Sequence, residues 1–165
     1  MKLPLLVLIA LHATAFAVPV EKLSDFELTD QNLKTRSYRF PKSKVTVMTV
    51  ADHKGSGQLA PWIQRLHDRY ENRIDIDGVA DVSMIPRPFH GVFRDAFRKQ
   101  LTRSVLLVWS GAVVRQFDYD KGVANLYVIN REGRLLKQFT GPVSDAAERE
   151  LTREIDRALA GTSSK

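Results

Sequence analysis

Apolar and polar positions follow one another along this chain with a period that changes several times. The stretch 45–51 is almost continuously apolar and β-branched, as expected of a central strand covered on both faces. From Ser56 to Asn72 the period becomes helical, with polar side chains on the opposite face. The apolar face comprises Leu59, Trp62, Ile63, Leu66 and Tyr70. The sequence therefore predicts a strand that leads directly into an amphipathic helix.

The same strand and helix pattern recurs further along the chain. Residues 74–82 predict a second strand, and Phe89, Phe93 and Phe97 mark a second helix. We expect this phenylalanine stripe to pack in the core. The other predicted strands are 105–108, 126–129 and 135–139, and the other predicted helices are 112–117 and a final one capped by Ser144 or Asp145.

Two short segments at the start, 26–28 and 38–40, are separated by the turn-like residues 29–32 and predict an N-terminal hairpin. Strands that alternate with helices, followed by a second hairpin and a last helix, predict an α/β fold. In such a fold a mixed sheet carries helices on both faces.

The first 17 residues have the pattern of a secretory signal. Lys2 precedes an apolar run from Leu3 to Leu11, and Ala15-Phe16-Ala17 offers a small-x-small cleavage site. The alternative is a buried N-terminal core helix. We expect export, to the periplasm in a Gram-negative source and otherwise to the medium. Residues 18–160 would then form one domain and 161–165 a flexible tail, with no transmembrane segment.

The chain contains no cysteine, which excludes thiol-disulfide exchange and cysteine peroxidase chemistry. Its formal net charge is +6. Arg87, Arg94 and Arg98 enrich the second predicted helix in positive charge, and such a basic surface could meet anionic lipid, a cell-wall polymer or an acidic partner. A solvated helix face would explain the same residues. We do not expect a nucleic-acid partner, because no base-stacking motif is present.

Three segments carry a resemblance to a known family. Residues 25–30, 108–111 and 126–133 resemble the redoxin and peroxiredoxin branch of the thioredoxin-like superfamily. This resemblance covers nearly the whole chain after the signal. It implies a thioredoxin-like three-layer sandwich, in which helices flank a mixed central β-sheet that begins with an N-terminal β-hairpin.

The resemblance also shows what this chain lacks. Thioredoxins carry a proline five residues after their second redox cysteine, and here Pro61 lies five residues after Ser56. On this register His53 and Ser56 stand where the two cysteines would be. The family's cis-proline falls in the stretch Val123-Ala124-Asn125, where we expect a trans bond between Ala124 and Asn125. The resemblance thus implies a redox-inactive descendant.

The candidate binding residues are Asp52, His53, Lys54, Ser56, Ala124 and Asn125. The end of a central strand and the start of a helix favour an anion, and Lys54 adds positive charge. We therefore expect either a protein or peptide partner or a small anionic ligand at this strand-to-helix edge, without a cofactor. Aromatic residues at 89–93 and Trp109 could wall a pocket near Ser56. In the alternative, Ser56 only caps its helix, Phe93 and Phe97 pack in the core, and Trp109 covers a sheet edge.

Two other function classes stay open. In an enzyme with non-thiol acid-base or hydrolytic chemistry, His53 would act as the general base and Ser56 as the nucleophile. In a structural or stress-protective protein, the chain would be held at an anionic surface. No metal site is expected, since His53, His67 and His90 show no close paired spacing.

Overall fold

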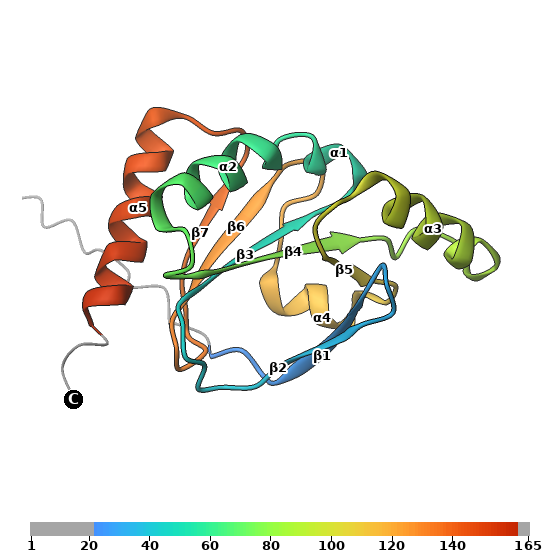
Figure 1. Cartoon of the computed structure of the whole chain (residues 1–165), viewed down its shortest axis with the longest axis horizontal. Coiled ribbons are helices and arrows are strands. Elements are labelled where there is room, and N and C mark those ends of the chain that lie inside the picture. The colour runs from blue at the N-terminus through green and yellow to red at the C-terminus, as the bar shows by residue number, and fades with distance from the viewer. Residues whose placement is uncertain (1–21, 162–165) are drawn as a thin grey trace, which may run out of the picture.

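The computed structural model describes residues 22–161, which form a seven-stranded mixed sheet with helices packed against it (Figure 1). The strands are β1 (Phe26–Asp30), β2 (Thr35–Tyr38), β3 (Thr46–Ala51), β4 (Asp75–Asp81), β5 (Val105–Val108), β6 (Asn125–Ile129) and β7 (Leu135–Thr140). The helices are α1 (His53–Ser56), α2 (Leu59–Tyr70), α3 (His90–Gln100), α4 (Gly111–Val114) and α5 (Asp145–Ala160), with the short 3-10 turns η1 (Arg87–Phe89) and η2 (Arg115–Phe117).

The sheet order is β2-β1-β5-β4-β3-β6-β7. The three central strands β3, β4 and β5 run parallel, while β1 pairs antiparallel with β5 and β6 pairs antiparallel with β3. Both predicted hairpins are present, as β1-β2 and β6-β7, although β1 continues to Asp30 and β2 ends at Tyr38, where the second strand was expected to begin. The carboxyl ends of β3 and β4 are directly paired at Ala51 and Ala80, so the loops that follow these two strands leave the sheet at the same edge.

Two hydrophobic cores lie on opposite faces of the sheet. On one face, α2 and α5 cover a core that includes Trp62, Leu66 and Ile155. On the other face, α4 and η2 cover a core that includes Met48 and Phe117. All six residues of β3 are buried, which confirms that this apolar run is a central strand covered on both sides. The result is the predicted sandwich of helices, mixed sheet and helices.

Helix α3 is the exception to this layered packing. It contains no buried residue, and Figure 1 shows it at one end of the molecule, away from α2 and α5. The expectation that its phenylalanines pack in the core is wrong: Phe93 is 42 % exposed, and Phe97 is only half-buried.

The helix predicted from Ser56 to Asn72 also differs in detail. It begins earlier, at His53, is interrupted at Gly57 and Gln58, and ends at Tyr70. The predicted signal peptide, residues 1–17, lies outside the described residues, as does all of the predicted tail except Gly161. Within residues 22–161, no helix is long and apolar enough to cross a bilayer.

Candidate functional site

Four of the six predicted candidate residues lie at a strand-to-helix junction, because α1 begins directly after β3; they are Asp52, His53, Lys54 and Ser56. Asp52 caps this helix. Its Oδ1 accepts a hydrogen bond from the Gly55 N–H at 2.8 Å, and its Oδ2 accepts one from the Gly122 N–H at 2.9 Å. The carboxylate therefore already occupies the amino end of α1, where an anionic ligand was expected.

Ser56 does not cap the helix, contrary to one of the two sequence interpretations. Its hydroxyl donates to the carbonyl oxygen of His53 at 2.7 Å, within the same turn. The His53 side chain is exposed and has no hydrogen-bond partner among residues 22–161. Since Ser56 is hydrogen-bonded to the backbone rather than to the imidazole, and Asp52 is bonded to two N–H groups, these residues do not form a nucleophile-base pair.

The loop before β6 packs tightly against α1. A Cβ atom at Gly55 would lie 2.2 Å from the carbonyl oxygen of Val123, so only glycine allows this approach. The aliphatic part of Lys54 runs beside Gly122, which has a φ of +79°. The loop thus closes one side of the junction.

Ala124 and Asn125 belong to this loop and to β6, and both are fully buried. The Ala124 N–H donates to Gln58 Oε1 at 3.1 Å, and its carbonyl accepts from the Gly141 N–H at 2.8 Å. The Asn125 amide donates to the carbonyl of Asp120 and accepts from its N–H. The bond between Ala124 and Asn125 is trans, as expected. The polar groups of these two residues are therefore occupied within the fold.

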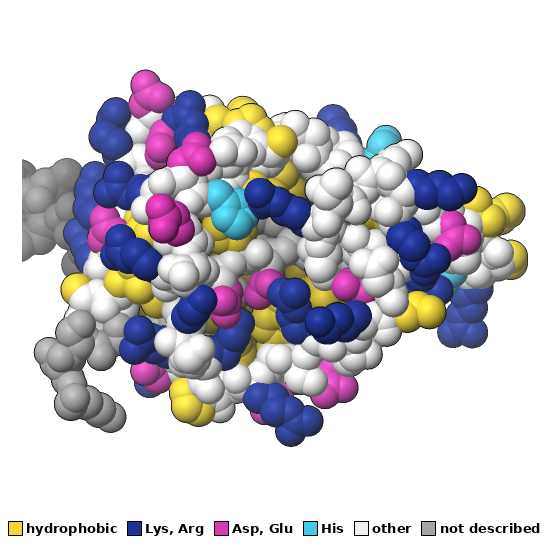
Figure 2. Space-filling model, viewed as in Figure 1, with side chains coloured by type: hydrophobic (Ala, Val, Ile, Leu, Met, Phe, Trp, Pro, Cys, Tyr) yellow, Lys and Arg dark blue, Asp and Glu magenta, His cyan; other side chains and the backbone are white. Residues whose placement is uncertain are grey.

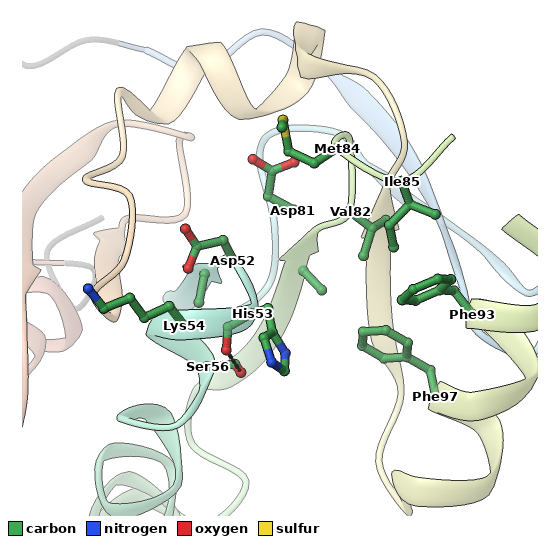
Figure 3. Close-up of a pocket in the computed structure, with 12 residues that line it drawn as sticks. Asp52, His53, Lys54, Ser56, Asp81, Val82, Met84, Ile85, Phe93 and Phe97 are labelled. Atoms are coloured by element: carbon green, nitrogen blue, oxygen red, sulfur yellow. Dashed lines mark hydrogen bonds between the residues drawn. The ribbon is translucent and has the colours of Figure 1, made fainter. Parts of the chain in front are cut away.

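On its other side, the junction borders an open groove of about 530 Å³ that reaches α3 (Figure 3). One wall is polar and comes from α1, with His53 and Ser56. The opposite wall is apolar and comes from the end of β4, the loop after it, and α3. The apolar side chains are Val82, Met84, Ile85, Phe93 and Phe97. Figure 3 shows the His53 ring pointing into the space between α1 and α3, whereas Lys54 points away from Phe93 and Phe97.

A fixed carboxylate lies at one end of the groove. Asp81 accepts hydrogen bonds from the Tyr119 hydroxyl and from the Ser83 N–H. Burial by itself would raise the pKa of Asp81, but the hydrogen bonds from Ser83 and Tyr119 outweigh it, so the pKa lies below its ordinary value. Burial and the neighbouring Asp81 raise the pKa of Tyr119. This pair therefore stays an ionised carboxylate with a neutral phenol at neutral pH.

The predicted basic surface is only partly free. Arg98 bonds to Asp95 and to the carbonyl of Gln31, and the Arg94 guanidinium lies 5.5 Å from the centre of the Trp109 ring. Arg87 is exposed in η1 and has no ion-pair partner among the described residues. His90 stacks on Trp109 with ring centres 3.9 Å apart. Trp109 thus anchors α3 and does not line the groove.

A second, polar cavity of about 440 Å³ lies near the start of β4. Its charged side chains neutralise one another: Asp77 is 5 % exposed and is paired with Arg36 and Lys42, and Lys42 also lies 3.0 Å from Asp75. Within residues 22–161, no three His, Asp or Glu side chains come together as a metal site. The groove is therefore the better candidate for a ligand.

Sequence reasoning found the polar wall of the groove but missed most of the apolar wall. Val82 was expected at the end of the second strand, and Met84 and Ile85 lie in the proline-containing loop after it, where no hydrophobic period marks them. Phe93 was proposed both as a pocket wall and as a core residue, and it lines the groove, whereas Phe97 was expected only in the core. The sequence lacks this information, because the helical spacing of an apolar stripe does not indicate whether the stripe packs in the core or lines a groove.

Comparisons with known proteins give a fold but no sequence relative. No protein-family model matches the chain, and no curated protein matches it. Among solved structures, the exposed lipoprotein thioredoxin Etrx1 from Streptococcus pneumoniae is 19 % identical with a TM-score of 0.64, covering 79 % of this chain and 99 % of Etrx1. A protein assigned as the thiol:disulfide interchange protein DsbE from Chlorobium tepidum is 17 % identical with a TM-score of 0.63, covering 85 % of this chain and 96 % of its own.

The protein has a thioredoxin-like fold. BsSco, a member of the Sco family of cytochrome c oxidase assembly proteins, has the same fold at 14 % identity and a TM-score of 0.58, covering 86 % of this chain and 95 % of BsSco. This thioredoxin-like chain nevertheless lacks the redox cysteines, since it contains no cysteine at all. A redox-inactive module is the description that fits both findings.

Proposed function

We propose that this protein is an exported, non-catalytic binding module that holds an apolar segment of a protein partner in the groove between α1 and α3. The observation that carries the proposal is the composition of the two groove walls. Phe93 and Phe97 offer apolar surface, and the opposite wall offers the unpaired imidazole of His53.

A peptide segment is the ligand that matches both walls. Its side chains can be buried against the phenylalanines, while its backbone N–H and C=O groups can bond to the polar wall. A small anion is the weaker candidate, because Asp52 already fills the amino end of α1. Export is supported by the signal pattern of residues 1–17, and Etrx1, which has a similar fold, is described as an exposed lipoprotein.

Binding can be tested with a fluorescein-labelled decapeptide in which two phenylalanines are flanked by glycine and serine. A second peptide with both phenylalanines replaced by serine is the ligand control. Fluorescence anisotropy should show saturable binding of the first peptide only. The Phe93→Ser variant should bind it at least about tenfold more weakly, since burial of a phenylalanine is worth about 1.5–3 kcal/mol.

Leu33 provides a matched control, because it is 61 % exposed and lies in the β1-β2 turn, outside the groove. Leu33→Ser should leave peptide affinity unchanged. If the native protein does not bind the phenylalanine peptide, or if Phe93→Ser binds it as tightly as the native protein does, the groove is not the binding site.

A further inference from the structure

Three polar side chains of α3, those of His90, Arg94 and Arg98, contact the rest of the molecule. The His90 ring stacks on Trp109, and its Nε2 lies 3.0 Å from the carbonyl oxygen of Ile85. Arg94 lies over the same tryptophan, and Arg98 donates to the carbonyl of Gln31 at 3.1 Å. In an amphipathic surface helix, apolar side chains normally make these contacts. In α3, by contrast, Phe93 and Phe97 line the open groove, and Val92 is 67 % exposed.

Most of the exposed large apolar side chains belong to the short segment 84–93, which leads into α3. Among the described residues, six large hydrophobic side chains are exposed, and four of them lie within residues 84–93. Met84 is 85 %, Phe89 53 % and Val92 67 % exposed. We refer to these three residues as the apolar tip. Phe89 and Val92 line neither the groove nor the polar cavity, so the binding proposal above leaves them without a role.

Positive charge surrounds the apolar tip. Residues 84–103 contain five Lys or Arg residues and one acidic residue, Asp95, which gives a net charge of +4 in a chain whose total is +6. Asp95 is paired with Arg98, whereas Arg87 and Lys99 have no ion-pair partner among residues 22–161. Figure 2 shows basic and apolar side chains interleaved at the α3 end of the molecule.

We propose that the apolar tip docks this protein onto the surface of an anionic lipid bilayer, with Phe89 and Val92 entering the boundary between headgroups and acyl chains. Aromatic and aliphatic side chains bordered by cations are typical of surfaces that lie in this interface. A bilayer takes up protruding side chains without a complementary cavity, whereas a protein partner would need one. Arg87 and Lys99 supply the attraction to anionic headgroups.

The experiment uses the chain that begins at Val18, which contains every residue of both hydrophobic cores. Its co-sedimentation is measured with vesicles of phosphatidylcholine alone and with vesicles containing roughly one-third phosphatidylglycerol. We expect binding to the anionic vesicles, and a loss of about fivefold in affinity for each cation removed in Arg87→Gln and Lys99→Gln. Added salt should weaken binding, because it screens these charges.

Insertion is tested separately from charge. Phe89→Ser/Val92→Ser should bind anionic vesicles at least about tenfold more weakly, since two apolar side chains lose their burial, while Leu33→Ser should bind as the native protein does. In Val92→Trp, the new indole should shift its emission to the blue on vesicle binding and be quenched by brominated lipid. The emission of the two native tryptophans should change little on vesicle binding, since Trp62 is 1 % exposed and Trp109 is half-buried.

The proposal is overturned if Phe89→Ser/Val92→Ser binds vesicles as the native protein does, or if Val92→Trp shows neither the shift nor quenching. It is also overturned if the native protein does not bind vesicles and instead forms dimers through the apolar tip. Analytical ultracentrifugation would detect such dimers, and Val92→Ser would abolish them. The peptide affinity of Phe89→Ser/Val92→Ser should equal that of the native protein, so failure of this proposal is distinguishable from failure of the groove.

Discussion

Helices α2 and α3 follow neighbouring parallel strands and carry apolar side chains at the same helical spacing, yet only α2 buries them. Trp62, Leu66 and Tyr70 of α2 are all at most 2 % exposed, whereas Phe93 of α3 is 42 % exposed. Polar groups decide the difference. Arg65 of α2 pairs with Glu148 of α5, whereas Arg94 and Arg98 of α3 lie against Trp109 and the carbonyl of Gln31. Amphipathic spacing gives a helix two different faces, and tertiary contacts determine which of them packs against the rest of the protein.

The largest expected effect comes from removing a large side chain from α2. Trp62 is 1 % exposed, and its Nε1 donates to the carbonyl of Gly141 at 3.0 Å. Trp62→Ala should lower the free energy of unfolding by about 3–5 kcal/mol, because it leaves a cavity and an unpaired carbonyl. Urea unfolding followed by circular dichroism measures the change. A loss below about 1 kcal/mol would mean that α2 is not held by its apolar face.

Tyr70 tests the same helix by pH. Its hydroxyl donates to Asp156 at 3.0 Å, and burial together with this hydrogen bond raises its pKa to about 12. The folded state therefore favours the neutral phenol. This contribution to stability is complete below pH 10, the ordinary pKa of tyrosine, and is lost as the pH rises through about 12.

Tyr70→Phe should cost about 1 kcal/mol of unfolding free energy at pH 8, the worth of one hydrogen bond. The difference between the two proteins should shrink between pH 10 and about 12, because only the native protein loses stability from Tyr70 there. The other three tyrosines also have raised pKa values, so the difference between the proteins, measured by urea unfolding at each pH, is the readout. A difference that does not change with pH would show that Tyr70 is not protected by α5.

The two helices also show how far sequence reasoning reaches. The limits of β5 and the cap of α5 by Ser144 were predictable, because they depend on neighbouring residues. The junction at His53 was predictable for the same reason. Its chemistry was not, since Asp52 bonds not only to the nearby Gly55 but also to Gly122, 70 residues further along the chain. Likewise, no residue near Phe93 in the sequence indicates that His90 and Arg94 of α3 contact Trp109.

The smallest expected effect belongs to the apolar face of α3. Phe93→Ser should change the free energy of unfolding by no more than about 0.5 kcal/mol, because the phenylalanine is 42 % exposed and borders an open groove, so its loss leaves no closed cavity. Backbone amides of α3 should exchange hydrogen for deuterium faster than those of α2, since α3 has no buried side chain to hold it closed. Urea unfolding and exchange mass spectrometry on the native protein and this variant measure both quantities. A destabilisation approaching that of Trp62→Ala would show that α3 packs its phenylalanines inward in solution, which would remove the contrast between the two helices and the open groove with it.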